Sequence, residues 1–146
     1  MTTKQRESGV DMVLVDTSVL IAFLKGQSSG KVSIFNEILS RDIPFGISAI
    51  TYQEVLQGAR DEAEFQTLKE YLSTQKIYFL EESTSIYEEA AMLHFKLRRK
   101  GITPRSTLDL LIAATAITNN LALLHDDRDF DTMAAHIPEL RILNSI

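Results

Sequence analysis

A short apolar run that ends in an acid constrains the fold of this chain more than any other feature. Residues Met12 to Val15 are all apolar and half of them are β-branched, as in a strand buried on both faces. Asp16 follows directly, and a second apolar run from Ser18 to Leu24 predicts a helix packed against that strand. Asp16 therefore lies where a central strand gives way to a helix, which is the edge where open α/β sheets bind ligands. The carboxylate is either a helix cap or part of a site, and the other acids decide which.

Short apolar runs alternate with helical patterns along the rest of the chain. Further strands are predicted at 45–47, 77–80, 121–124 and 140–143, with segments of helical apolar spacing between them. This alternation is typical of an α/β fold with a short, mainly parallel β-sheet flanked by helices on both faces. We expect a single domain over residues 12–146, preceded by a polar, aperiodic and flexible N-terminal tail over residues 1–11.

Polar residues predict where several helices begin. Ser48 is placed to cap the helix that follows the second strand. Asp61 with Glu64, and Ser85 with Glu88, have the spacing of a capping box. Each pair precedes apolar residues at helical spacing, so both are expected to start a helix.

Composition and charge exclude several classes of protein. Of the 146 residues, 45% are hydrophobic and 24% charged, as in an ordinary globular protein. The longest apolar runs are far below the roughly 20 residues that span a bilayer, and no export signal is recognisable, so we expect a cytoplasmic protein without a membrane partner. Zero cysteines exclude disulfides, thiolate ligands and cysteine nucleophiles. The net charge of −5 argues against a large nucleic-acid-binding surface, unless the acids surround a metal that offsets them.

Acids at or near strand ends and helix starts are the candidate site residues: Asp16, Glu54, Asp109, and the pair Asp127 and Asp129. Each has an explanation that needs no site. Asp16 can cap the first helix, and Ser106 with Asp109 has capping-box spacing. Glu54 can be a solvated helix residue, and the acids after residue 124 can form an acidic turn that the helix dipole favours.

Taken together, the acids favour a metal site. Asp109 begins an otherwise apolar helix and Asp127 follows an apolar strand after two residues, so both lie next to the core. If the strands are parallel, Asp16 and Asp127 lie on the same edge of the sheet. Two carboxylates about 4 Å apart repel by about 4 kcal/mol at an effective dielectric of 20, so gathering them requires a cation. Oxygen ligands without cysteine select a hard ion such as Mg²⁺ or Mn²⁺.

Four motifs resemble, in order and spacing, those of PIN-domain nucleases. They are Val-Asp-Thr-Ser-Val-Leu-Ile at 15–21, Ser-Ala-Ile-Thr-Tyr-Gln-Glu at 48–54, Asp-Leu-Leu-Ile-Ala-Ala-Thr-Ala at 109–116 and Leu-His-Asp-Asp-Arg-Asp-Phe-Asp at 124–131. The length and the strand–helix order are similar too, and the resemblance covers residues 12–146. Within that family the chain most resembles the VapC-type toxins of bacterial and archaeal toxin–antitoxin pairs.

The resemblance implies an endoribonuclease that cleaves RNA phosphodiester bonds with Mg²⁺, or Mn²⁺ as a substitute. By position, the catalytic acids are Asp16, Glu54, Asp109 and Asp127. The expected metal ligands among them are Asp16, Asp109 and Asp127. Glu54 is expected to orient or deprotonate the attacking water.

Residues beside these acids have possible secondary roles in the resemblance. Asp129 matches a frequent fifth acid, and Ser18 or Thr17 matches a hydroxyl next to the metal. His125 departs from the family, because many relatives carry Thr or Ser there. Burial and contact with the site both stay open for this histidine.

The resemblance also implies partners. These are the RNA substrate, a cognate antitoxin docked on the apolar surface of the first two helices, and a second copy in a homodimer. Arg98, Arg99 and Lys100 either complement the dipole at a helix end or, with Arg105, meet RNA phosphates. Two alternatives remain: a PIN nuclease of RNA processing or decay without an antitoxin, and a non-catalytic metal-binding module whose acids are structural.

Overall fold

Helices and strands alternate through residues 12–146, which are the residues that the computed structural model describes. The predicted tail at 1–11 lies outside the described residues. In chain order the elements are β1 (Val13–Val15), α2 (Thr17–Leu24), α3 (Gly30–Ser40), β2 (Phe45–Ser48), α4 (Ala49–Gln57), α5 (Glu62–Ser73), β3 (Lys76–Tyr78), α6 (Ser85–Arg99), α7 (Thr107–Thr118), β4 (Ala122–Leu124), α8 (Arg128–His136) and β5 (Arg141–Ile142). None of the helices in this part of the chain is long and apolar enough to cross a lipid bilayer.

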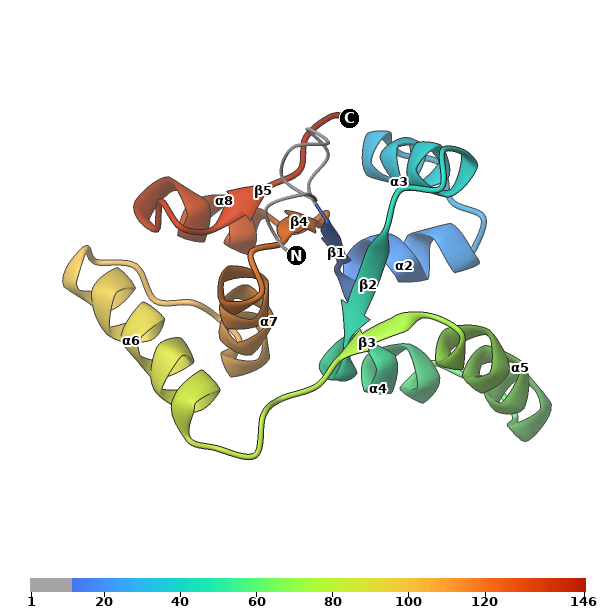
Figure 1. Ribbon diagram of the computed structural model, residues 1–146, viewed down its shortest axis with the longest axis horizontal. Helices are drawn as coiled ribbons and strands as arrows, with labels where there is room; N and C mark the ends of the chain where they lie inside the picture. Colours follow the sequence, from blue (N-terminus) through green and yellow to red (C-terminus); the bar gives the residue numbers. More distant parts are fainter. Residues whose placement is uncertain (1–11) are drawn as a thin grey trace.

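A parallel sheet of five strands lies at the centre, in the order β3-β2-β1-β4-β5 (Figure 1). Every neighbouring pair is parallel, so the mainly parallel sheet predicted from the sequence is confirmed. From β1 the chain builds β2 and β3 on one side and then returns to build β4 and β5 on the other. The direction of building reverses between β1 and β4, and the carboxyl ends of such strands form a crevice where ligands bind.

Each face of the sheet has its own hydrophobic core. Val13 and Val15 face one core, shared with α2, α3, α4 and α5, whereas Leu14 faces the other, shared with α6, α7 and α8. This division follows from the period of two in a strand. Phe35 of α3 and Phe130 of α8 are fully buried in the two cores. Helices therefore cover both faces, as the sequence predicted (Figure 1).

The helix starts agree with the sequence at two places and differ at a third. The hydroxyl of Ser48 accepts from the Thr51 amide at 3.0 Å, and the carboxylate of Asp61 accepts from the Glu64 amide at 2.7 Å. The capping box predicted at Ser85 and Glu88 is wrong. Thr84 is the N-cap of α6, with φ −76° and ψ −9°, and makes no side-chain cap. Its backbone is already helical and lacks the extended conformation that lets a cap side chain fold back onto the helix.

Gly46 in β2 lies where the sheet leaves no room for a side chain. A Cβ there would be 2.6 Å from Cε2 of Tyr78 and 2.9 Å from the carbonyl oxygen of Lys76. Both neighbours belong to β3, whose Lys76 pairs with Gly46, so the carbonyl cannot move without disturbing the ladder. We expect Gly46→Ala to lower the free energy of unfolding by about 1–3 kcal/mol, measured by urea unfolding.

Gly30→Ala is the matched control, because a Cβ at this first position of α3 meets nothing within 4 Å. It should be neutral or stabilise by up to about 1 kcal/mol, since alanine loses less backbone entropy in a helix. Equal destabilisation by the two variants would contradict the steric account of Gly46.

Candidate active site

Five acids from four segments of the chain surround one region at the carboxyl ends of β1 and β4. Asp16 follows β1, Asp127 and Asp129 follow β4, Asp109 lies in the first turn of α7, and Glu54 lies on α4. Burial first, and then the negative charges of Asp16, Asp127, Asp129 and Glu54, raise the pKa of Asp109 to about 6. The other four acids are thus close enough to act on Asp109, and the structure brings the predicted catalytic acids together.

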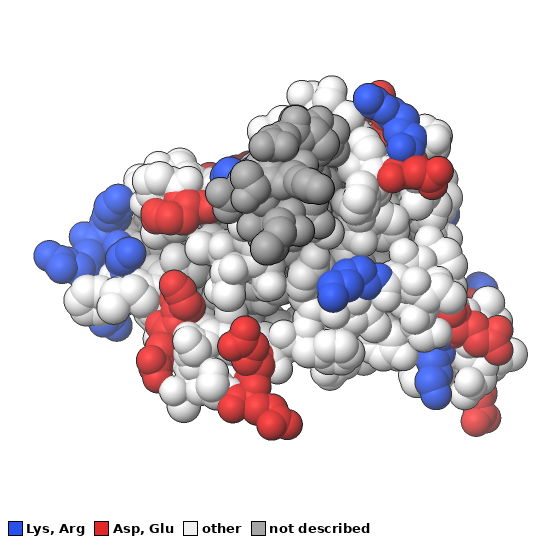
Figure 2. Space-filling view, in the orientation of Figure 1, with Lys and Arg blue, Asp and Glu red and all other residues white. Residues whose placement is uncertain are grey.

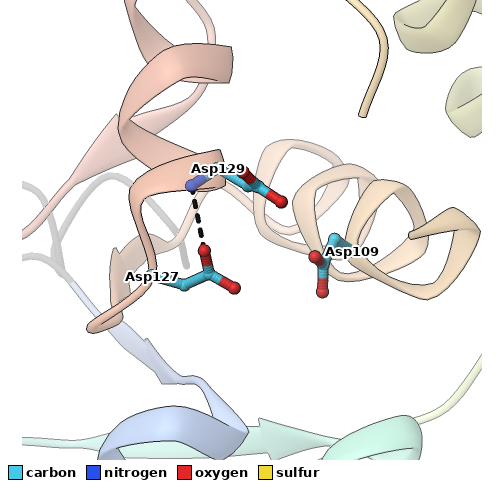
Figure 3. A group of neighbouring side chains, drawn as sticks. All are labelled: Asp109, Asp127 and Asp129. Carbon is cyan, nitrogen blue, oxygen red and sulfur yellow. Dashed lines mark hydrogen bonds between the residues drawn. The ribbon is translucent and has the colours of Figure 1, made fainter. Parts of the chain in front are cut away.

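Three of these acids are close enough to share an ion. Carboxylate oxygens of Asp109, Asp127 and Asp129 lie within 4.8 Å of one another and point toward a common space (Figure 3). Asp127 is the N-cap of α8, and its Oδ1 accepts from the amide of Asp129 at 2.9 Å. The sequence predicted Asp16 as the third member of this group, whereas the structure brings Asp129 within this distance. That predicted ligand role of Asp16 stays a prediction.

The donors of this acid triad fit a hard divalent cation. All are carboxylate oxygens, which such ions prefer. Within residues 12–146 the carboxylate of Asp109 receives no hydrogen bond, although its backbone amide donates to the Ser106 hydroxyl. An acid without a donor, half-buried and next to two other carboxylates, is stabilised by a nearby cation more than by any neighbouring side chain.

Asp16 is a helix cap and also a neighbour of the triad. Its side chain is only 5% exposed, and Oδ2 accepts from the amide of Ser18 at 3.1 Å and from its hydroxyl at 2.7 Å. Burial raises the pKa of Asp16, whereas the hydrogen bonds from Ser18 lower it. Asp16 can therefore be both a helix cap and part of the site, because capping leaves its carboxylate near Asp109.

Ser18 and His125 hold the loop that carries Asp127. The hydroxyl of Ser18 accepts from the amide of Asp126 at 2.9 Å, which ties this loop to the start of α2. His125 is only 1% exposed, and its Nδ1 accepts from the amide of Asp127 at 2.9 Å. Nε2 therefore carries the ring proton and faces Oδ1 of Asp131 at 3.1 Å. Burial lowers the pKa of His125, so the neutral ring is favoured.

Glu54 is held by one hydroxyl group, which contacts a second that the sequence did not predict. The hydroxyl of Thr17 donates to Oε1 of Glu54 at 2.6 Å and lies 2.9 Å from the hydroxyl of Thr51. Thr17 was expected beside the site, whereas Thr51 was not. Thr51 is fully buried and stands three residues before Glu54, so both lie on one face of α4. That spacing is the sequence signal that places Thr51 near the site, where its hydroxyl contacts Thr17.

Arg105 is a second residue with an unpredicted contact. Its guanidinium pairs with both carboxylate oxygens of Asp129, at 3.1 and 3.2 Å. The Arg105 side chain is 80% exposed, so solvent screens this ion pair strongly. One screened positive charge cannot offset three carboxylates, so the triad stays net negative and could hold a cation.

Comparisons with known proteins agree with this geometry. The family model described as PIN domain matches residues 13–136. Ribonuclease VapC51 of Mycobacterium tuberculosis is 34% identical over 122 residues, which cover 84% of this chain and 85% of that protein. Ribonuclease VapC11 of the same species is 29% identical over 124 residues, covering 84% and 92%. A toxin–antitoxin complex from Klebsiella pneumoniae contains a chain with a TM-score of 0.64 and 26% identity, covering 92% of this chain and 99% of that one. The chain therefore belongs to the PIN domain family, among its VapC-type members.

Proposed function

We propose that this protein is a divalent-metal-dependent endoribonuclease that acts as the toxin of a toxin–antitoxin pair. The acid triad of Asp109, Asp127 and Asp129, beside Asp16 and Glu54, is the observation that carries the proposal. The similar proteins named ribonucleases support RNA as the substrate class. A metal-binding module without catalysis needs no acid fixed beside the triad, whereas Glu54 is fixed there by a hydrogen bond of 2.6 Å.

Asp109, Asp127 and Asp129 are the residues that would hold Mg²⁺ or Mn²⁺, with Asp16 as a further ligand, directly or through water. A bound ion of this kind would lower the pKa of a coordinated water and offset charge on the phosphodiester. The protein's own contribution is to hold the carboxylates in fixed positions. Capping of α8 by Asp127 and capping of α2 by Asp16 fix both side chains relative to their helices.

Glu54 is the residue proposed to orient the attacking water and accept its proton. The hydrogen bond from Thr17 occupies Oε1 and leaves Oε2 for the water. A general base must lie within hydrogen-bond reach of the proton it takes, so this fixed orientation suits the role. Asp16, tied to Ser18 through Oδ2, is less free to turn toward a water.

A basic segment gives the RNA backbone a place to bind on an acidic chain. The last turn of α6 carries Lys96, Arg98 and Arg99, and Figure 2 shows basic side chains gathered where α6 ends. The loop after α6 leads through Arg105 to Asp109. These basic side chains are placed to bind the RNA phosphates on either side of the cleaved bond.

Two protein partners belong to the same proposal. The similar Klebsiella pneumoniae chain is part of a toxin–antitoxin complex, which supports an antitoxin partner. Leu24 of α2 and Leu39 of α3 are 38% and 37% exposed, and we expect an antitoxin segment to cover them. The homodimer stays a prediction. The cytoplasmic location is likewise still a prediction.

Cleavage of a labelled single-stranded RNA by the purified protein tests the proposal. We expect cleavage with Mg²⁺ or Mn²⁺, loss of all cleavage with a chelator, and recovery when the metal is restored. Expression of the parent should halt growth of the host, whereas Asp127→Asn should not. Cleavage that persists in the chelator would contradict metal dependence. Metal binding without cleavage would indicate the non-catalytic module.

A further inference from the structure

A series of hydroxyl groups in contact with one another extends from the buried end of β2 to Glu54, the proposed general base. Ser48 Oγ lies 3.3 Å from Oγ1 of Thr51, Thr51 lies 2.9 Å from Oγ1 of Thr17, and Thr17 lies 2.6 Å from Oε1 of Glu54. Ser48 is 2% exposed and Thr51 0%, whereas Thr17 and Glu54 are partly exposed at the site. This series of hydroxyl groups therefore links the β2–α4 junction with the β1–α2 junction.

The donor and acceptor in each hydrogen bond of this series follow from the number of protons available. Each hydroxyl has one proton to donate, and an ionised carboxylate only accepts. Thr17 must give its proton to Glu54, so Thr51 donates to Thr17, and Ser48 donates to Thr51. Ser48 meanwhile accepts from the amide of Thr51 at 3.0 Å, which fixes the first hydroxyl. Hydrogen bonds in such a series polarise and strengthen one another.

Thr51 is the middle member of the series and contacts both Ser48 and Thr17. Without the hydroxyl of Thr51, the Thr17 side chain would lose the 2.9 Å contact that holds its oxygen in place, and it could turn away from Glu54. Thr51 touches neither the acid triad nor any position open to RNA, because its side chain is fully buried. The contact through which Thr51 reaches the chemistry is the one with Thr17, which in turn holds Glu54.

We propose that Thr51 is a positioning residue for RNA cleavage, which holds the Glu54 carboxylate in one orientation through Thr17 and leaves its second oxygen for the attacking water. This inference rests on the proposed ribonuclease function. It assigns Ser48 a second role besides capping α4, namely to anchor the buried end of the series. A purely structural Thr51 would support packing of α4 without affecting the chemical step.

Three variants separate these roles. Thr51→Val keeps the shape and removes the hydroxyl, Thr51→Ser keeps the hydroxyl, and Thr115→Val is the matched control. Thr115 is also buried, and its hydroxyl donates to the Leu111 carbonyl within α7 at 2.7 Å, outside the series. With saturating metal, Thr51→Val should lower kcat for RNA cleavage about tenfold with KM within about twofold of the parent, as expected for loss of a supporting hydrogen bond. Thr51→Ser should restore most of kcat, and Thr115→Val should keep the parental kcat.

Parental kcat in Thr51→Val, equal losses in Thr51→Val and Thr51→Ser, or an equal loss in Thr115→Val would overturn the proposal. A crystal structure of Thr51→Val supplies a readout that does not depend on activity. Glu54 should leave its single orientation and lose its contact with Thr17; an unchanged Glu54 would overturn the proposal even if the parent cleaves RNA. If the parent cleaves no RNA, the ribonuclease function fails first, and the Glu54 orientation still decides whether Thr51 positions it.

Discussion

Asp109→Asn is expected to abolish RNA cleavage and, at the same time, to stabilise the metal-free protein. Asparagine keeps the shape of the side chain but removes the charge that the neighbouring acids repel. The rise of the Asp109 pKa from 3.8 to about 6 corresponds to at most about 3 kcal/mol, and solvent screening at this half-exposed side chain reduces it to about 1 kcal/mol. Loss of a metal ligand should lower cleavage at least about 100-fold.

The same charge predicts a pH dependence of stability. The pKa of Asp109 is higher in the folded than in the unfolded state, so the folded protein binds more protons between pH 4 and 6. The contribution of Asp109 to stability is therefore most favourable below about pH 4 and is lost as the pH rises through about 6. Relative to the parent, Asp109→Asn should gain stability across this window and keep the gain at pH 7.

Thermal unfolding in a chelator and in Mg²⁺ measures these effects. In the chelator, Asp109→Asn should unfold about 3 °C above the parent at pH 7. Added Mg²⁺ should raise the unfolding temperature of the parent more than that of the variant, because only the parent keeps all three ligands. Asp61→Asn, which changes an acid at the start of α5 outside the site, should differ from the parent by less than about 2 °C in both conditions. A loss of several kcal/mol by Asp109→Asn in both conditions would identify the residue as a structural cap.

The placement of Asp16 and Asp127 on one edge of the sheet was predictable from the sequence. Both follow short apolar strands, and parallel strands bring their carboxyl ends together. The pairing of β1 with β4 confirms this, since Val15 lies opposite Leu124. The alternation of short apolar strands with helical segments was thus sufficient to predict the fold class and the edge of the sheet where the site lies.

The composition of the acid triad was not predictable in the same way. Spacing along the chain does not reveal where a side chain points, and Asp16 is turned toward the Ser18 amide at 3.1 Å. Asp129 enters the triad because Asp127 caps α8 and thereby sets the direction of its first turn. Local hydrogen bonds at two helix starts decide which acids meet.

Contacts between distant segments were the least predictable part. The ion pair of Arg105 with Asp129 joins residues 24 positions apart, and Thr17 meets Glu54 across 37 positions. Neither pair has a periodic pattern that marks it in a single sequence. These contacts depend on how the loop before α7 and the start of α4 approach the sheet, which only the folded structure determines.

Asp16→Asn and Asp16→Ala together should separate the cap from the chemistry. An asparagine oxygen can accept the same two hydrogen bonds from Ser18, and asparagine caps helices as well as aspartate does. Burial raises the pKa of Asp16, so removing its charge costs no stability in the metal-free protein. Asp16→Asn should therefore unfold at or above the parental temperature, yet lose at least about 100-fold in RNA cleavage.

Asp16→Ala removes both functions and should lose about 1–2 kcal/mol of stability in addition to cleavage, because the Ser18 amide and hydroxyl are left without their acceptor. Measured side by side, urea unfolding gives the cost of the cap, and RNA cleavage gives the contribution of the charge. Cleavage by Asp16→Asn at the parental rate would make Asp16 a cap alone, and the negative charges needed for catalysis would then belong to the acid triad and Glu54. Loss of cleavage by Asp16→Asn without loss of stability would instead show that catalysis needs the charge of Asp16. The helix cap then serves to hold a buried charge beside Asp109, where only a bound cation can offset it.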